Sequence, residues 1–490
     1  MILILLLAIP ILGGLLSWGA EKWNPSLPRW ISLLALMADF VLALLLWMIP
    51  RTHSGTWFAQ FDAAWISQWG VRFHLGIDGL SFLLVLLTLF LGILSVISSW
   101  RSIQFRVGFF HLNLMWVLSG IIGVFLALDL FLFYFFWELM LVPMYFLIGI
   151  WGHENRTYAA MKFFLFTQAS GLLMLLSILG LYSIHGLSTG TYTFDYPQLL
   201  STTLSPRTGL FLMLGFFIAF AVKLPMVPLH TWLPDAHTEA PTAGSVILAG
   251  LLLKTGGYGL IRFILPLFPS PAHQVSPIVM ALAVAGILYG GIMAFSQKDL
   301  KRLVAYTSVS HLGFVLLGVF AGTPLALQGA VIQMICHGLS TGGLFILVGG
   351  IQDRIRTRNI DKLGGIGSIA PRMTHSALFF ALASLGLPGI GNFIGEFLTL
   401  LGTYEVHPLL GALASFGSVI SAVYSLRIIQ TVFHGSLNNT LAAERLVDLS
   451  GRETLIMATL VVALLWIGMN PQPLLNATSV ELDKVSHAYH

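Results

Sequence analysis

Apolar runs of about 20 residues recur along the whole chain and are separated by short polar segments. A helix of that length crosses the hydrocarbon core of a bilayer, so the pattern predicts an all-α, polytopic membrane protein with about fourteen transmembrane helices. The longest polar stretches, 51–76 and 188–206, have only the size of loops. The predicted limits of the helices are 2–19, 30–49, 79–98, 108–127, 130–150, 162–184, 208–230, 242–265, 276–295, 302–321, 327–350, 373–402, 408–433 and 453–469.

Two of these helices carry a proline near their middle. Pro225 follows Val222-Lys223-Leu224 in the seventh helix, and Pro388 lies in Leu385-Gly386-Leu387-Pro388-Gly389 in the twelfth. Proline removes a backbone donor and clashes with the preceding turn, so each helix should open there. An open backbone at membrane depth is tolerated only against protein or water.

The two breaks lie in the seventh and twelfth helices, five helices apart. Because five is an odd number, these two helices cross the membrane in opposite directions. This predicts two inverted five-helix repeats, an arrangement in which paired broken helices mark an ion path. The predicted units are 1–107 (three helices and an external loop), 108–265 (first repeat), 276–433 (second repeat) and 434–490 (last helix and tail).

Composition supports a membrane location, because 57% of the 490 residues are hydrophobic and only 9% are charged. Soluble domains contain about 25% charged residues.

Loops and helix ends on one side of the predicted topology hold 17 Lys and Arg, Arg445 among them, and those on the other side hold 5, Arg51 among them. The positive-inside rule then puts the first set in the cytoplasm and both termini on the periplasmic side. The scattered basic residues form no nucleic-acid-binding face, and the single cysteine excludes an internal disulfide or a cysteine-ligated cluster.

Four ionisable residues, Glu138, Lys223, Lys254 and Glu396, lie inside predicted membrane helices. A charge near the bilayer centre costs about 2.5 kcal/mol or more, so such residues are functional candidates. A dry site favours neutral lysine and a nearby carboxylate favours the charged form, so a Glu–Lys pair can act as a two-state proton site. We therefore predict a proton relay. The alternative is a set of static buried ion pairs.

Histidines occupy the intervals between these residues. His230 and His237 belong to the predicted connection 229–243, and His311 and His337 lie deep in the tenth and eleventh helices. Imidazole can accept and donate a proton near neutral pH, which suits a proton path, although each ring could equally be structural. No metal site is predicted, because His230 and His237 are seven residues apart without a third ligand at a typical spacing.

Several motifs resemble the antiporter-like membrane subunits of respiratory NADH:quinone oxidoreductase. The motifs are Ala221-Val-Lys-Leu-Pro-Met-Val-Pro-Leu-His-Thr-Trp-Leu-Pro-Asp-Ala-His-Thr-Glu-Ala-Pro-Thr242, Leu253-Lys-Thr-Gly256, Phe136-Trp-Glu-Leu-Met140, Lys298-Asp-Leu-Lys-Arg-Leu303, Tyr306-Thr-Ser-Val-Ser310 and His337-Gly338. Glutamate in the twelfth helix, within Gly391-Asn-Phe-Ile-Gly-Glu-Phe397, is similar to the M type of subunit, whereas lysine there is typical of the L and N types.

The resemblance implies roles for the residues named above. Glu138 would pair with Lys223, Lys254 would be the central lysine, His311 and His337 would lie on the connecting path, and Glu396 would be the exit residue. His230 and His237 match histidines of the family's linker between helices seven and eight.

The resemblance also implies a setting. The chain would hold no cofactor itself, with FMN, iron–sulfur clusters and quinone in partner subunits, L-type and N-type neighbours beside it, and a bacterial inner membrane around it. Three alternatives stay open: a subunit of a multisubunit Na⁺/H⁺ antiporter, the membrane arm of a hydrogenase-type complex, and a passive scaffold.

Overall fold

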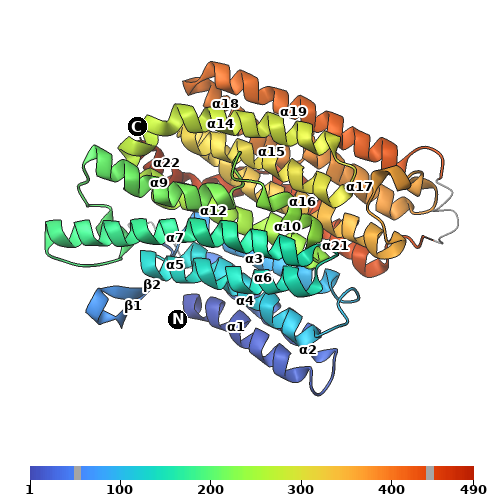
Figure 1. Ribbon diagram of the computed structural model, residues 1–490, viewed down its shortest axis with the longest axis horizontal. Coiled ribbons are helices and arrows are strands. Elements are labelled where there is room, and N and C mark those ends of the chain that lie inside the picture. The colour runs from blue at the N-terminus through green and yellow to red at the C-terminus, as the bar shows by residue number, and fades with distance from the viewer. Residues whose placement is uncertain (49–56, 438–445, 490) are drawn as a thin grey trace.

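The computed structural model describes residues 1–48, 57–437 and 446–489. Its helices lie side by side in one bundle, and both chain termini are at the same end (Figure 1). We call this the terminus end, and we call the opposite end, which holds residues 99–106, 152–155 and 356–370, the far end. Arg51 and Arg445 of the charge count, position 49 of the second predicted helix and part of the stretch 51–76 lie outside the described residues.

The predicted all-α membrane fold is confirmed. Among the described residues, 13 helices are long and apolar enough to cross a membrane. They are α1 (Ile2–Ala20), α2 (Leu27–Trp47), α3 (Gly79–Ser98), α4 (Val107–Leu126), α5 with α6 (Leu130–Leu139 and Leu141–Trp151), α7 (Arg156–Thr189), α9 (Pro206–Lys223), the composite helix Thr242–Leu267, α14 (Pro269–Ser296), α15 (Leu300–Ala321), α16 (Pro324–Ile355), α19 with η6 (Pro408–Ile428 and Ile429–Phe433) and α21 (Gly451–Met469).

The remaining predicted helix, the twelfth, consists of two short helices, α17 (Pro371–Ser384) and α18 (Gly391–Val406). The intervening turn contains Pro388, as predicted from the sequence. Gly386 and Gly389 have φ of +76° and +95°, a conformation that residues with a Cβ rarely adopt. Glycine at these two positions lets the backbone leave one helix and start the next within a few residues.

The first break also lies at its predicted proline. Helix α9 ends at Lys223, and Met226 N–H donates to Ala221 O in place of the amide that Pro225 lacks. The indole N–H of Trp232 donates to Val222 O at 2.9 Å, so it satisfies a carbonyl that the break leaves free. This pairing is needed because an unpaired carbonyl is costly inside apolar surroundings.

The segment predicted as the connection 229–243 instead forms a second half of the broken helix. Helix α10 (Trp232–Glu239) packs against α7 and α15 and reaches toward the far end (Figure 1). Hydropathy misses it because four of its eight residues, Asp235, His237, Thr238 and Glu239, are polar. Their polar groups face protein, and seven of the eight are buried.

The composite eighth helix occupies the centre of the bundle and is buried over its whole length. It consists of α11 (Thr242–Ile247), η2 (Leu248–Leu252), α12 (Leu253–Gly259), η3 (Leu260–Ile264) and α13 (Leu265–Leu267), of which η2 and η3 are π-helical. A Cβ at Gly256 would lie 2.7 Å from Phe220 O, so this glycine allows α12 to approach α9 closely. Two π-helical turns flanking one short α-helix are a feature often found at functional sites.

Two strands and one helix, besides α10, were not predicted from the sequence. Strands β1 (Ala59–Ile66) and β2 (Val71–Ile77) form an antiparallel hairpin in register from Ala59 opposite Ile77 to Ile66 opposite Val71, where a loop was expected. Helix α22 (Gln472–Tyr489) follows α21 at the terminus end. The predicted loop 188–206 contains a short helix, α8 (Tyr196–Leu199), and three 3₁₀ turns complete the elements: η1 (Ser67–Trp69), η4 (Ile360–Lys362) and η5 (Ile366–Ser368).

Helix α22 is held against the terminus end by close backbone packing and by hydrogen bonds. A Cβ at Gly79 would overlap the carbonyl oxygen of Ala477, so the start of α3 and the backbone of α22 touch directly. At its other end, Ser486 Oγ donates to Gly322 O at 2.7 Å and Tyr489 Oη to Phe320 O at 3.0 Å.

A pH dependence of α22 docking follows from Glu481. Its carboxyl group is buried beside Asp78, and burial together with that negative charge raises the pKa of Glu481 to about 7. A raised pKa means that the docked helix binds a proton more tightly than the undocked helix. Docking is therefore strongest below the ordinary pKa of glutamate and weakens as the pH rises through about 7.

We expect hydrogen exchange of α22 amides in the intact protein to be slower at pH 5 than at pH 8, after correction for intrinsic exchange rates. Glu481→Gln should remove this difference, because a neutral amide loses no proton. Asp483→Asn, at an exposed position on the same helix, should retain it. Equal protection of α22 at both pH values in the unmodified protein would contradict this assignment.

Candidate functional site

Lys254 lies at the centre of the bundle with none of its surface exposed. Its Nζ donates to Ala249 O, in the π-helical turn η2, and shares a hydrogen bond of 2.7 Å with His337 Nδ1. A buried ammonium group requires such acceptors, because removing it from water without them is costly. The π-helical turn therefore supplies one acceptor from the same helix and α16 supplies the other.

A line of polar groups continues from His337 to His311 and Glu396. The rings of His337 and His311 have centroids 5.9 Å apart. His311 Nδ1 then lies 2.7 Å from Glu396 Oε1, so α15 and α18 are joined across the second break. All four residues, Lys254 included, are buried. The structure thus brings together four of the eight predicted site residues in one continuous series.

Two side chains that sequence reasoning missed complete this series. Tyr424 Oη, from α19, lies 3.0 Å from His311 Nε2, so both ring nitrogens of His311 have a partner. Gln333 Nε2 donates to Glu396 Oε1 at 3.0 Å, while Gln333 Oε1 has no partner among the residues that the structure describes. Neither residue stands out in the sequence, because a lone Tyr or Gln in an apolar helix has no characteristic spacing.

Glu138 and Lys223 were expected to pair, and the structure places them near one another without a direct bond. Glu138 Oε1 and Lys223 Nζ are both buried, and neither has a hydrogen-bond partner among the described residues. Tyr134 and Gln168 offer side-chain hydrogen bonds to Glu138. Gly171 leaves space beside Oε1, since a Cβ there would lie 2.8 Å from it. The carboxylate is therefore adjustable in position.

Aromatic rings surround the other member of this pair. Lys223 Nζ lies 5.1 Å from the centroid of the Trp137 ring and 5.6 Å from that of Phe163. The faces of aromatic rings attract a cation without fixing its direction. Lys223 ends helix α9, where the helix dipole also favours a positive charge. The site can thus hold a charged lysine without binding it to one oxygen.

His230 and His237 lie on either side of the start of α10. The ring of His230 packs edge-on against Tyr289, at 5.2 Å between centroids. His237 is stacked on Phe345 at 4.8 Å, and both of its ring nitrogens are buried without a partner in the part of the chain that the structure describes. Lys254 and Lys301 are both close enough to act electrostatically on His237. His237 is therefore near both the central lysine and a second buried lysine that was not predicted as a site residue.

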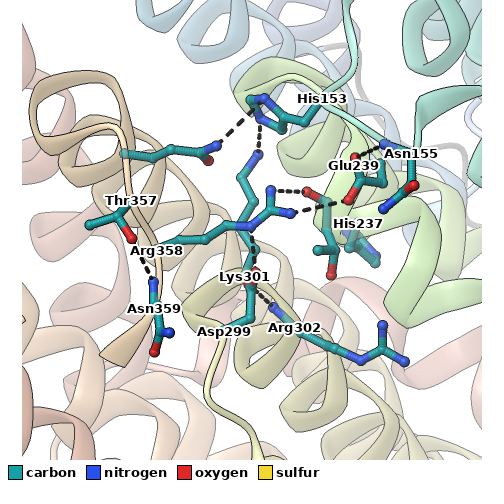
Figure 2. Close-up of polar contacts among 12 residues, drawn as sticks. His153, Asn155, His237, Glu239, Asp299, Lys301, Arg302, Thr357, Arg358 and Asn359 are labelled. Atoms are coloured by element: carbon teal, nitrogen blue, oxygen red, sulfur yellow. Dashed lines mark hydrogen bonds and ion pairs between the residues drawn. The ribbon is translucent and has the colours of Figure 1, made fainter. Parts of the chain in front are cut away.

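That second lysine belongs to a polar network at the far end (Figure 2). Lys301 Nζ donates to Ala240 O at 2.8 Å and lies 3.3 Å from His153 Nε2. Arg358 forms ion pairs with Glu239, at 3.1 Å, and with Asp299. Burial and the charges of Lys301 and Arg358 lower the pKa of His153 to about 3, so its ring is neutral at physiological pH.

The chemistry available to this constellation is proton binding and transfer. It contains carboxylates, amines, imidazoles and a phenol, which all exchange protons. The described residues include no group of three or more His, Cys, Asp or Glu placed to hold a metal ion. The His311–Glu396 and Lys254–His337 contacts are hydrogen bonds along which a proton can move.

Comparisons with known proteins agree on one family. The model of the family "NADH:quinone oxidoreductase/Mrp antiporter, TM" matches residues 127–421. NADH-quinone oxidoreductase subunit M of Pseudomonas aeruginosa is 52% identical over 498 residues, which cover 99% of this chain and 97% of that protein. A chain of respiratory complex I from Thermus thermophilus with bound NADH superposes with a TM-score of 0.88 at 34% identity, over 100% of both chains.

A chain of the Mrp complex from Dietzia sp. DQ12-45-1b shares the fold, with a TM-score of 0.85 at 24% identity. The match covers 98% of this chain and 52% of that chain. At this identity the likeness concerns the fold alone.

Tyr424→Phe tests the contact that sequence reasoning missed. Removal of the hydroxyl leaves His311 Nε2 buried without a partner, at a cost of about 1–3 kcal/mol. We expect a lower midpoint of thermal unfolding of the detergent-solubilised protein. Tyr404→Phe, at a position that is 56% exposed, should leave the midpoint unchanged. Equal midpoints for the two variants would show that the Tyr424 hydroxyl does not stabilise His311.

Proposed function

The chain belongs to the family of subunit M of NADH:quinone oxidoreductase, a multi-pass membrane component of a respiratory complex, and on that premise we propose that it moves protons outward from the cytoplasm. The redox reaction that drives the movement takes place in partner subunits. Within this chain, the proton is carried by buried Glu, Lys and His side chains.

The observation that supports this function best is the series from Lys254 through His337 and His311 to Glu396. Its members are an amine, two imidazoles and a carboxylate, each of which can release and accept a proton, and they extend from Lys254 at the centre of the bundle to Glu396 in α18. A bundle held together by static ion pairs would instead show each charge bound to an opposite charge. Lys254 is bound to an imidazole and a carbonyl, which favours transfer.

The Glu138–Lys223 pair of the first predicted repeat supplies a means of controlling proton transfer. Glu138 and Lys223 act on each other electrostatically without a bond, so a small movement or a change in hydration alters the charge that each favours. Such a change at one buried group shifts the proton affinity of the next. Moving one charge against 100 mV costs about 2.3 kcal/mol, which a pKa change of about two units supplies.

Orientation and partners follow from the same premise. The far end carries most of the basic residues and faces the cytoplasm in this proposal, which puts the termini on the periplasmic side of a bacterial inner membrane. The L and N subunits are its neighbours. FMN, iron–sulfur clusters and quinone belong to other subunits. An Na⁺/H⁺ antiporter subunit or a hydrogenase-type arm shares this architecture and would differ in its partners.

We expect Lys223→Ala and Glu138→Gln, each in the assembled complex in sealed vesicles, to lower proton pumping per NADH by about a hundredfold, the usual range for loss of a proton-transferring group. Coupled NADH:quinone turnover should fall with pumping. Lys22→Ala and Glu405→Gln change exposed residues of the same types and should pump normally. Normal pumping by assembled Lys223→Ala and Glu138→Gln complexes would mean that the chain is a passive scaffold.

A further inference from the structure

A polar cavity of about 410 Å³ opens at the far end, where α15, α16 and the segment before α7 meet. Its walls include His153, Glu154, Gln352 and Arg358, together with Lys298. The outer part reaches the surface, since Glu154 is exposed and the Lys298 side chain is 73% exposed. Water can therefore reach the inner wall of this cavity without crossing apolar surface.

The inner wall is formed by His153, whose two ring nitrogens have different neighbours (Figure 2). Nδ1 lies 3.5 Å from the side-chain amide of Gln352, another residue of the cavity wall. Nε2 lies 3.3 Å from Lys301 Nζ, behind the wall. Lys301 itself is fully buried. A neutral imidazole in this position connects the cavity with a buried amine.

Behind Lys301 lies the relay described above. Lys301 Nζ donates to Ala240 O, three residues beyond His237. Lys301 and Lys254 both act electrostatically on His237. Neither ring nitrogen of His237 has a hydrogen-bond partner among the described residues. His237 is therefore placed to receive a proton from one lysine and deliver it toward the other.

Ion pairs keep the surroundings of Lys301 fixed. Among the described residues, the charges that act on Lys301 belong to the cation Arg358, from the loop after α16, and to the carboxylates Asp353, Asp299 and Glu239. Arg358 binds Asp299, Glu239 and Thr238 O, which fastens the end of α10 to the start of α15. These ion pairs hold Glu239 and Asp299 in place, and the Lys301 amine contacts His153 and Ala240 O instead.

We infer that Lys301, reached from the far-end cavity through His153, is the site at which protons are loaded into the buried relay, and that His237 receives them next. In the transfer, a proton from cavity water binds His153 Nδ1 while the proton on Nε2 passes to neutral Lys301. Exchange between the two neutral tautomers then resets the ring. The inference rests on the proposed function and identifies its uptake site.

A purely structural role offers a clear contrast. Lys301 could serve only to cap α10 through Ala240 O, and His153 only to fill space. An arginine at position 301 keeps the positive charge and the ability to donate to a carbonyl, but it does not release its proton. Lys301→Arg therefore separates capping from proton loading.

We expect the assembled Lys301→Arg complex to pump at least about tenfold fewer protons per NADH in sealed vesicles, while NADH oxidation by a soluble artificial acceptor is unchanged. Lys362→Arg, at an exposed position of the same end, should pump normally. Normal pumping by Lys301→Arg would overturn the inference. If the Lys301→Arg complex fails to assemble, the His153→Ala complex tests the uptake route instead.

His153→Ala removes the imidazole from the wall of a cavity that is large enough to admit a free imidazole molecule. We expect pumping to fall severalfold and to recover most of the loss when imidazole is added. His375→Ala, which changes an exposed histidine, should show neither effect. Normal pumping without imidazole, or a loss that imidazole does not restore, would overturn the uptake route. Either result, with Lys223→Ala and Glu138→Gln still inactive, would leave the proposed function standing.

Discussion

The burial of one amine, that of Lys254, imposes the central requirement of this structure. A lysine far from water must be met by acceptors inside the protein, and the π-helical turn η2 and His337 provide them. Because His337 accepts at Nδ1, its ring is fixed beside His311, and His311 is in turn fixed by Glu396 and Tyr424. The position of four helices, α12, α15, α16 and α18, is thereby tied to the same amine.

The two repeats meet this requirement differently. In the second repeat the ionisable groups are joined by short hydrogen bonds, as His311 and Glu396 are. In the first predicted repeat Glu138 and Lys223 are not bonded to each other, with space at Gly171 and aromatic faces around the amine. A bonded pair transfers a proton readily, whereas an unbonded pair responds strongly to small changes in distance. The two predicted repeats therefore suit different tasks.

The sequence predicted the helices, both breaks and the buried charges because these depend on local properties, namely apolar run length, proline chemistry and the cost of burying a charge. It missed helix α10, because polar residues that face protein look like a loop, and helix α22, because an amphipathic helix lacks the length of apolar run that marks a span. Tyr424, Gln333 and His153 could not be found either. Their importance arises from contacts between helices far apart in the chain, and the motif around Lys301 indicated a family without indicating a role.

Several charges at the ends of the bundle are held in ion pairs, whereas Glu138, Lys223 and Lys254 in its middle form no ion pair among the described residues. Arg358 is bound to Glu239 and Asp299 at the far end, and Arg262 to Asp78 at the terminus end. Between the two ends lie polar atoms of Glu138, Lys223 and His237 that have no hydrogen-bond partner among the described residues. Ion pairs with a fixed partner lose much when that partner is removed, so they hold the helix ends in place. Because the helix ends are held in place, the helices do not move far when a group in the middle of the bundle gains or loses a charge. The protein responds instead by moving a proton from one buried group to another.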